Sequence, residues 1–538
     1  MLATSHIRAL LLVGIMCLAP LSGCFGEDDG NDMPSMNDVV VTPEVLSGGV
    51  FQALTISAQQ DVSAFVPYLI KDVITGYVFN STVVDLRQGD SVQLNVLAPP
   101  RTNSAYVFIG EFGRNNWPIR EINESWSTWI AEDGHLSADR GAVMSIGSEN
   151  VTFNSSQETG GPVAYYPLAV ARENAPGYSE DEGGRHSTGV VNGRTTYNFL
   201  SHLTDQTPDP SDLADGAVGY LDRWAGQGNG AYEAGAVYLQ DQLESFGLDV
   251  VTQRYAFTDI LENQNPEAYN ICGFRYGSEF PDEWMVFGAH FDVAPPANAL
   301  LLDPHVTGVR TYGTRVGAYD NTAGTSMVLT VAEAMANYET RRTMVFCLWS
   351  SEEEGLWGSR SFANDLPDGV TVSNYLNLDM AGVNYPGDYA LSVYLGPDGT
   401  GDVIDQAGMY HLAEWIGADA LDLGNEIDRG REAWLEGGES PLWGDIYEDT
   451  VAIYESPTAR SDHDSFQNIG VATLGWNGLV DGYPCYHREC DTMETMIEYM
   501  GTENSTGINN LVHSWDIVTW WAVYAFLHMD QTPVPNEL

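Results

Sequence analysis

The sequence predicts an α/β fold with a mixed central sheet flanked by helices, preceded by an antiparallel β-sandwich-like domain. In the carboxyl-terminal part, short apolar strands alternate with helical patterns, which is typical of a sheet covered by helices. In residues 39–174, short runs of alternating apolar and polar residues are separated by Gly, Asp, Asn and Pro. With 538 residues and 43% hydrophobic side chains, the chain is long enough for two or three domains.

The charge balance excludes some classes of partner. The chain has 75 Asp plus Glu against 22 Lys plus Arg, a net charge of −53. Such a surface repels phosphate, so we expect no binding of nucleic acid or of anionic lipid surfaces. An acid-rich, lysine-poor surface is also similar to that of salt-adapted proteins, but solubility alone explains it equally well.

The first 23 residues predict a lipoprotein-type signal peptide. Arg8 precedes an apolar run, 9–21, that is too short to span a bilayer, and small residues then lead into Cys24. This pattern resembles a lipobox, in which Cys24 carries lipid after cleavage. We expect an exported chain anchored at the extracellular face of the cell membrane. The alternative is an ordinary signal peptide and a secreted or periplasmic protein.

The rest of the chain divides by composition. A polar tether covers 24–38, the β-rich accessory domain covers 39–174, and a linker rich in Gly, Glu, Asp and Ser covers 175–205. The second domain, 206–538, contains a long acidic and aromatic insertion at 383–460. We find no catalytic pattern in the accessory domain and expect the insertion to form a wall or a lid of the site.

Four cysteines remain after Cys24, an even number that predicts disulfides in an oxidising compartment. Cys485 and Cys490 are close enough in sequence to close a small loop, but the pairing is open. Because there is no CxxC pair, we do not expect a zinc site made of thiolates.

The second domain shows strands and helices in alternation. Residues 231–246 have helical spacing and end before Gly247, and the other predicted helices are 325–337 and 509–528. The predicted strands are 284–288, 343–349, 375–378 and 471–475. Ligands of such sheets bind beyond the carboxyl ends of the strands, and polar residues gather at these places.

The first two polar motifs hold three candidate site residues. His290 and Asp292 follow the first strand with a spacing of two, so one side chain would bind a metal while the other orients it. Asp320 lies in a glycine-flanked turn at the start of a helix. Each also has a structural explanation: a buried histidine, or a helix cap.

The later motifs complete the set. Glu352, Glu353 and Glu354 follow a buried strand, where adjacent carboxylates repel one another and favour a cation between them. Asp379 follows the next strand, and His463 precedes the last one. Singly, each fits a solvated loop or a helix start. Together they indicate a metal site, since such ligands recur beside successive strands.

These motifs, read in order, resemble a known family. They are similar to the motifs of the co-catalytic zinc aminopeptidases: His-x-Asp, Gly-Ala-x-Asp-Asn, Glu-Glu-x-Gly-Leu-x-Gly-Ser, Leu-Asp-Met and Ser-Asp-His-x-x-Phe. That family includes bacterial leucyl aminopeptidases, glutamate carboxypeptidases and glutaminyl cyclases. The resemblance covers residues 213–538 and leaves the accessory domain outside.

The resemblance implies a role for each residue. Asp320 would bridge two Zn²⁺ ions, with possible substitution by Co²⁺ or Mn²⁺. The remaining protein ligands would be His290 and Asp379 for one ion, and Glu353 and His463 for the other. Glu352 would be the general base that deprotonates the bridging water, and Asp292 would orient His290.

The segment 486–492 resembles the Tyr-His-x-x-x-Asp-Thr run of the same family, although its two cysteines are not part of that pattern. We expect His487 to line the pocket, where it would contact the substrate or support a metal ligand or else be structural, and we do not assign it a catalytic role.

The implied function is hydrolysis of peptides at a chain end, and an aminopeptidase is favoured because free α-amines are the commonest substrate end in this family. A carboxypeptidase is an alternative. A glutaminyl cyclase, with a single zinc, and an inactive receptor-type binding module are two more. The complete ligand set favours hydrolysis, although fold alone does not establish chemistry. Side-chain specificity and oligomeric state stay open.

Overall fold

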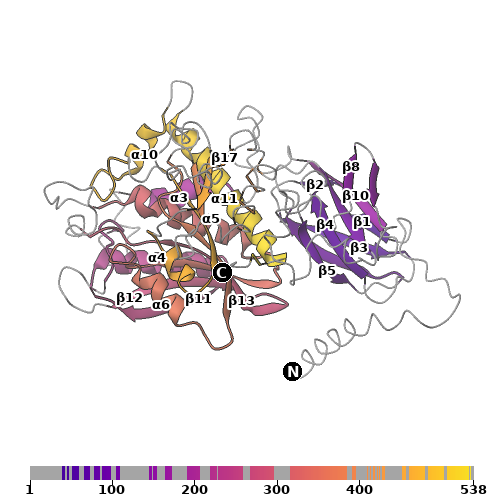
Figure 1. Ribbon diagram of the computed structural model, residues 1–538, viewed down its shortest axis with the longest axis horizontal. Helices are drawn as coiled ribbons and strands as arrows, with labels where there is room; N and C mark the ends of the chain where they lie inside the picture. The colour runs from indigo at the N-terminus through magenta and orange to yellow at the C-terminus, as the bar shows by residue number, and fades with distance from the viewer. Residues whose placement is uncertain are drawn as a thin grey trace.

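A computed structural model of the chain describes most of the carboxyl-terminal part (Figure 1). The described residues there are 191–205, 219–258, 267–295, 315–383, 460–478, 483–501 and 506–534, with single-residue gaps at 227 and 532. Parts of 39–171 and 391–455 are also described. The predicted signal peptide, Cys24 and tether lie outside the described residues.

The described residues of the carboxyl-terminal part build a nine-stranded mixed sheet in the order β11-β12-β14-β13-β15-β19-β16-β18-β17. Its centre is parallel, because β14, β13, β15 and β19 all run the same way. The strands are β11 Asp249–Ala256, β12 Glu267–Arg275, β13 Phe280–His290, β14 Arg342–Trp349, β15 Thr371–Leu378, β16 Leu391–Leu395, β17 Ile427–Arg429, β18 Val451–Glu455 and β19 Ala472–Asn477.

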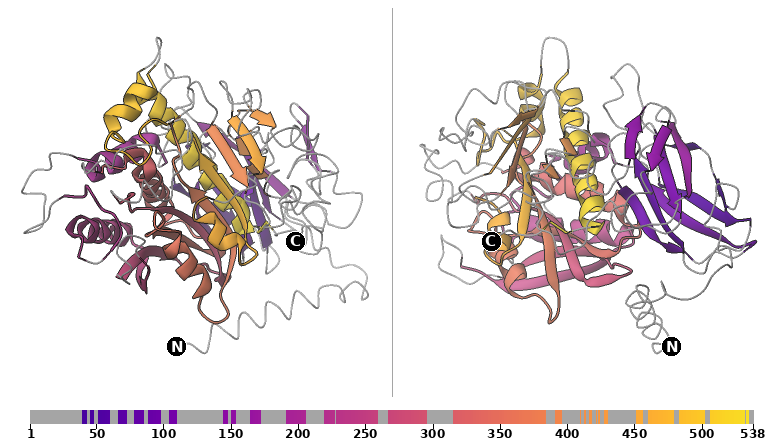
Figure 2. Two further views of the ribbon diagram at one scale, coloured as in Figure 1. Left: turned by 60° about the vertical axis from the view of Figure 1, so that its left-hand side comes forward. Right: turned by 45° about the vertical axis from the view of Figure 1, so that its right-hand side comes forward.

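Helices cover both faces of this sheet, which confirms the predicted α/β fold (Figure 2). Inward-facing residues of β13, such as Phe287, belong to a large core shared with α3, α4, α5 and α11. Alternate residues, such as Val286, pack with α6 and α9 on the other face. The helices are α3 Gly193–Leu203, α4 Gly230–Ser245, α5 Ala323–Met335, α6 Trp357–Asn364, α9 His463–Gln467, α10 Met493–Tyr499 and α11 Gly507–Gln531.

The central elements are buried on all sides, and their sequences explain why. Every residue of β14 is buried, as its apolar run requires of a strand covered on both faces. Helix α5 is also buried almost all round and contacts α3, α11 and the sheet. A disulfide between Cys272 of β12 and Cys347 of β14 joins residues that face each other in register.

Two segments differ from the sequence-based expectation. Residues 193–203, which were expected in the linker, form α3, packed against α5 and α11. The described parts of the insertion 383–460 include β16, β17 and β18, which extend the sheet beyond β19. Each of these strands is only three to five residues long, so period-two alternation gives little signal there.

The accessory region is β-structured, as predicted, and lies to one side of the α/β part (Figure 1). Its described strands form a three-stranded sheet, β1-β3-β6, a five-stranded sheet, β2-β10-β7-β4-β5, and the pair β8-β9. All pairs are antiparallel except β2 with β10. Its arrangement as a sandwich stays a prediction. The strands are β1 Val39–Thr42, β2 Val45–Ser47, β3 Phe51–Ala58, β4 Val66–Asp72, β5 Val78–Val84, β6 Ser91–Leu97, β7 Ser104–Ile109, β8 Met144–Gly147, β9 Asn150–Phe153 and β10 Ala164–Ala171.

None of the helices among the described residues combines the length and apolar character needed to cross a membrane.

Candidate metal centre

His290 is the last residue of β13 and is almost completely buried. Its Nδ1 lies 3.1 Å from the carbonyl oxygen of Asp292 and 3.7 Å from the Asp292 carboxylate. Its Nε2 has no hydrogen-bond partner among the described residues. The contacts of Asp292 therefore fix the ring from behind, and Nε2 faces the other carboxylates of the cluster.

Asp320 is held by backbone contacts at both sides of its turn, residues 318–322 (η4). The backbone N–H groups of Tyr319 and Asp320 donate to the two oxygens of Asp491, at 2.9 and 3.0 Å. The side chain of Asn321 donates to the carbonyl of Leu378 at 2.7 Å. Because Leu378 ends β15, this bond ties the Asp320 turn to the carboxyl edge of the sheet.

Glu352 and Glu353 follow β14 on a tight loop that α6 closes. Ser351 and Leu356 have φ angles of 54° and 60°, a left-handed conformation that side chains rarely adopt. Such backbone persists only where the surrounding structure imposes it, and it is common at functional sites. The loop turns both carboxylates back to the edge where His290 lies.

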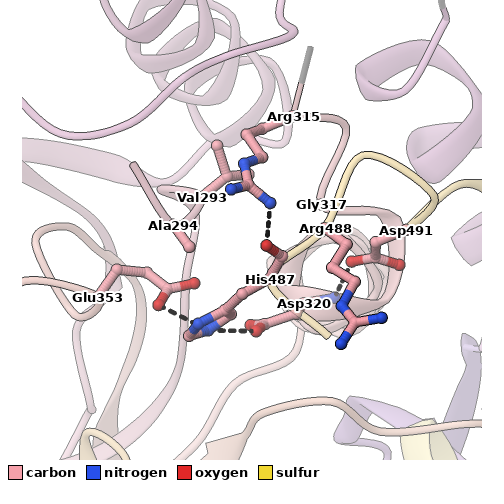
Figure 3. Close-up of a pocket in the computed structure, with 9 residues that line it drawn as sticks. All are labelled: Val293, Ala294, Arg315, Gly317, Asp320, Glu353, His487, Arg488 and Asp491. Carbon is pink, nitrogen blue, oxygen red and sulfur yellow. Dashed lines mark hydrogen bonds and ion pairs between the residues drawn. The ribbon is translucent and has the colours of Figure 1, made fainter. Parts of the chain in front are cut away.

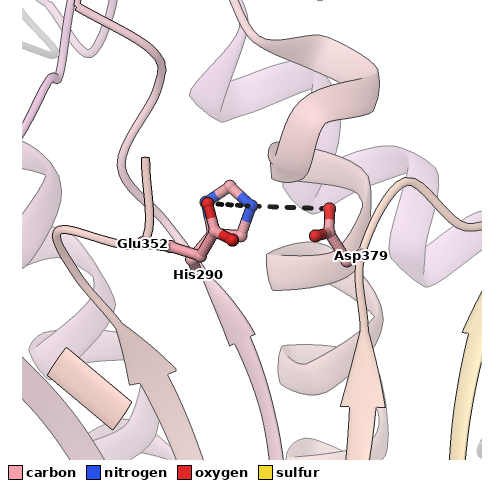
Figure 4. Close-up of side chains that lie close together, drawn as sticks. All are labelled: His290, Glu352 and Asp379. Carbon is pink, nitrogen blue, oxygen red and sulfur yellow. Dashed lines mark ion pairs between the residues drawn. The ribbon is translucent and has the colours of Figure 1, made fainter. Parts of the chain in front are cut away.

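Asp379 follows β15 and points toward His290 (Figure 4). The carboxylates of Asp320, Asp379 and Glu352 lie 3.4, 3.5 and 3.9 Å from His290 Nε2. These separations are long for hydrogen bonds. They leave the ligand atoms of His290, Glu352 and Asp379, and those of His290, Asp320 and Glu353, within 4.8 Å of one another.

His487 joins the cluster from the loop that follows β19. Its Nε2 lies 2.9 Å from Glu353 and 3.1 Å from the second oxygen of Asp320 (Figure 3). The disulfide Cys485–Cys490 closes this loop, and the ring of Tyr486 stacks on His487 with centroids 3.8 Å apart. Asp320 thus lies between two histidines, one on each carboxylate oxygen.

His463, the predicted fifth ligand, lies in neither group of candidate metal ligands among the described residues and, unlike His487, has no ion pair with Asp320 or Glu353 there. Both ring nitrogens are buried and have no hydrogen-bond partner among the described residues, and its ring packs 4.9 Å from that of Tyr394. Burial lowers its pKa to about 3, so it is neutral at pH 7.

The order of elements along the chain explains why His487, and not His463, contacts the cluster. The ligands come from loops after the carboxyl ends of β13, β14 and β15, and the corresponding loop of β19 carries His487. His463 instead lies on α9, which precedes β19. The same rule, applied to the predicted strand 471–475, would have pointed to His487.

Charge repulsion in the metal-free site is strong. Burial, with neighbouring carboxylates, raises the pKa of Glu353 to about 7 and that of Glu352 well above its usual value. Burial alone would lower the pKa of His290, but the carboxylates around it, Glu352 foremost, raise it well above its usual value. These shifts show that positive charge is favoured at this place.

Arg223 fixes the loops beneath the site. Its fully buried guanidinium donates to the carbonyls of Phe291 and Val316 at 2.7 and 3.3 Å, and also to the hydroxyl of Thr322. These three acceptors flank the segments that carry His290 and Asp320. The role of this arginine could not be predicted from the sequence, because a single arginine before a predicted helix is not part of a motif with defined spacing.

The residues present fit zinc. Imidazole nitrogens and carboxylate oxygens suit zinc, and the set has no thiolate. The residues that would hold the cation are His290, Asp320, Glu353, Asp379 and His487, because Asp320 has one oxygen near His290 and the other near His487. Buried His290 Nε2 and Asp379 Oδ1 without hydrogen-bond partners are the groups that a cation would satisfy.

Replacing Asp491 by Asn should weaken metal binding without removing a ligand. The amide oxygen of Asn can still accept from the N–H of Tyr319, but its NH₂ group would face the N–H of Asp320. Because two donors then face each other, the Asp320 carboxylate should shift. We expect zinc affinity to fall about 10–100-fold, the usual effect of losing an orienting partner. Competition with a chromogenic chelator measures this affinity, and an unchanged affinity would contradict the role of Asp491.

Comparison with known proteins identifies the family that part of the chain matches. Residues 270–509 match the family described as Peptidase family M28, so the resemblance seen in the motifs is confirmed over these residues. The chain is 27% identical over 283 residues to the glutamate carboxypeptidase 2 homolog of Caenorhabditis briggsae, covering 49% of this chain and 31% of that protein. It thus spans about a third of the length of that relative.

Two further similarities are shorter or structural. Leucine aminopeptidase 2 of Trichophyton rubrum is 32% identical over 114 residues, 20% of this chain and 22% of that one. The crystal structure of Porphyromonas gingivalis glutaminyl cyclase superimposes with a TM-score of 0.43 and 16% identity, over 62% of this chain and 98% of that one.

Proposed function

We propose, from the match of residues 270–509 to peptidase family M28, that this chain is a zinc-dependent exopeptidase, and specifically an aminopeptidase. The observation that carries the proposal is the position of Asp320, with one carboxylate oxygen facing His290 and the other facing His487. A carboxylate shared by two otherwise separate ligand sets is the arrangement that a pair of metal ions needs.

The proposed chemistry uses Glu352 as the general base. Bound divalent cations would supply the electrophilic assistance that peptide hydrolysis needs, by polarising the carbonyl and acidifying a water. The Glu352 carboxylate takes the proton of the attacking water and passes it to the leaving amine. Glu352 suits this role because it is buried beside His290 but, unlike Glu353, makes no close contact with His487.

Two alternatives remain within the same family. The relatives include carboxypeptidase and aminopeptidase names, and a glutaminyl cyclase is among the similar structures. We favour an aminopeptidase because the site has enough imidazole and carboxylate groups for two ligand sets, which would suit hydrolysis, and because its surplus of carboxylates would attract a free α-amine. Loss of a ligand set would instead favour a single-metal cyclase or an inactive binding module.

Metal removal tests the proposed function directly. Dialysis against a chelator should abolish release of amino-terminal residues from aminoacyl amides, and added zinc should restore it. Elemental analysis of the active protein should give roughly two zinc per chain, as a shared bridging carboxylate requires. One zinc with pyroglutamate formation would replace the proposal with cyclisation, and release from carboxyl-terminal ends alone would make it a carboxypeptidase.

We also propose that the protein works outside the cell, anchored by lipid at Cys24, with peptides as its substrates. The support is the sequence pattern of residues 1–24 and the two disulfides, which suit an oxidising compartment. Metabolic labelling with a fatty acid, lost on Cys24→Ala, would identify the anchor. Recovery of the protein only from the cytosol would contradict it.

A further inference from the structure

A small cavity adjoins the candidate metal centre and contains two arginines. It is partly open to solvent and encloses about 190 Å³ when that open space is counted, and its lining includes Arg315 and Arg488 together with Asp320, Glu353 and His487. Val293 and Ala294 give it a short apolar wall (Figure 3). Two guanidinium groups at one cavity are notable in a chain with 22 Lys plus Arg against 75 Asp plus Glu.

Arg315 has a structural role. Its side chain is largely buried, and its guanidinium donates to the carbonyl of His487. Its backbone N–H donates to the carboxylate of Asp222 at 2.6 Å. Arg315 therefore holds the His487 loop in place while adding positive charge to the cavity.

Arg488 has no such role among the described residues. Its backbone N–H donates to the carbonyl of Cys485, and its carbonyl accepts from Asp491, so the main chain is fixed by the disulfide-closed loop. The residue is exposed, and no hydrogen bond or ion pair joins its guanidinium to another described residue. Figure 3 shows this guanidinium on the Asp320 side of the cavity.

Each carboxylate of the same cavity contacts at least one described residue. Glu353 and Asp320 contact His487 at 2.9 and 3.1 Å. Asp491 accepts from two backbone N–H groups and from the hydroxyl of Tyr483. The side chain that is left to contact an incoming molecule is therefore the cation of Arg488, whose planar guanidinium suits a carboxylate.

We propose that Arg488, backed by Arg315, forms a carboxylate-binding subsite beside the metal centre, so that the enzyme favours peptides carrying a carboxylate near the scissile bond. The carboxylate could belong to an acidic side chain or to the free end of a short peptide, since both present the same group. This specificity rests on the proposed exopeptidase function, but the subsite itself is built only from residues of this chain.

The test compares matched peptides on the full-length, zinc-loaded protein. One arm exchanges Glu for Gln at the first or second residue, and a second arm exchanges a free carboxyl end for an amide. We expect kcat/KM to be about tenfold higher for the carboxylate member of at least one pair, the effect of one charge-assisted hydrogen bond at a partly exposed site. The arm that responds identifies the source of the carboxylate.

Variants then assign the preference to the arginine. In Arg488→Gln, the ratio of kcat/KM between the two peptides of the responding pair should fall close to one. In Arg488→Glu, this ratio should invert, and a peptide with Lys in place of Glu should be favoured. Arg254→Gln on β11 changes the net charge equally but lies outside the cavity lining, so it should keep the wild-type ratio. The subsite would be overturned if wild type showed kcat/KM ratios near one for every peptide pair, or if Arg488→Gln kept the wild-type preference.

A binding measurement separates this proposal from the proposed function. Titration calorimetry with glutamate and glutamine should show about tenfold tighter binding of glutamate, lost in Arg488→Gln. If no peptide is hydrolysed, the exopeptidase function fails while this difference still supports the subsite. If peptides are hydrolysed but glutamate and glutamine bind equally to wild type and variant, the subsite fails alone.

Discussion

Replacing Glu352 by Ala should reduce kcat by about 10³-fold while the protein keeps its zinc, because a positioned general base contributes roughly 10²–10⁴-fold. Glu352 lies 3.9 Å from His290 and is not one of the carboxylates that contact His487. Its removal takes away the proposed acceptor of the water proton and leaves the proposed zinc ligands in place. Steady-state kinetics on an aminoacyl amide, with zinc analysis of the same sample, measures both quantities.

The adjacent Glu354 provides the control. It belongs to the same acidic run and is also buried, but it is not part of either group of candidate metal ligands. Glu354→Gln keeps the shape of the side chain and removes one negative charge, and we expect kcat within about threefold of wild type, as for a change away from the reacting atoms. Loss of zinc in Glu352→Ala would instead make Glu352 a ligand and leave the base unassigned.

If the chain binds the two zinc ions that we propose, replacing His487 by Ala should cost one of them. A structural zinc site binds with roughly 10–16 kcal/mol shared among its ligands, so losing one ligand should weaken that position by on the order of 10²–10³-fold. His487 contacts both Asp320 and Glu353, so its removal affects the whole of one ligand set. Zinc per chain after gel filtration, together with chelator competition, reports the loss.

His463→Phe is the matched comparison, since sequence analysis gave that histidine the same role. Its nitrogens have no hydrogen-bond partner among the described residues and its ring packs near Tyr394, so a phenyl ring should fit the site. We expect full zinc content and a change in unfolding free energy of less than about 1.5 kcal/mol, typical of a volume-conserving swap. The opposite pattern, zinc lost from His463→Phe and kept in His487→Ala, would restore the original assignment.

The central strands could be predicted because their burial leaves a strong pattern. β13, β14 and β15 are mostly buried, and polar residues follow each of them; β13 and β14 also contain a continuous apolar run. The position of His290, Glu353 and Asp379 at one edge follows from that arrangement. The additional strands of the insertion were not predicted, because short edge strands differ little in composition from loops.

Contacts between distant segments had no signal in the sequence. The pairing of Asp491 with the backbone of Tyr319 and Asp320 joins residues more than 170 positions apart. The choice between His463 and His487 likewise depends on which side of β19 each lies. Spacing along the chain reports local geometry, whereas these contacts depend on how the loops close over the sheet edge.

The Cys272–Cys347 disulfide has a consequence for how the molecule reaches its native state. The two cysteines are 75 residues apart and become opposite neighbours only when β12 and β14 have paired in register. The covalent loop between them contains His290 and Asp320. Once formed, this bond keeps β12 and β14 linked at the paired residues even when the chain unfolds. It restricts the conformations of the unfolded chain and so stabilises the native state by about 4 kcal/mol.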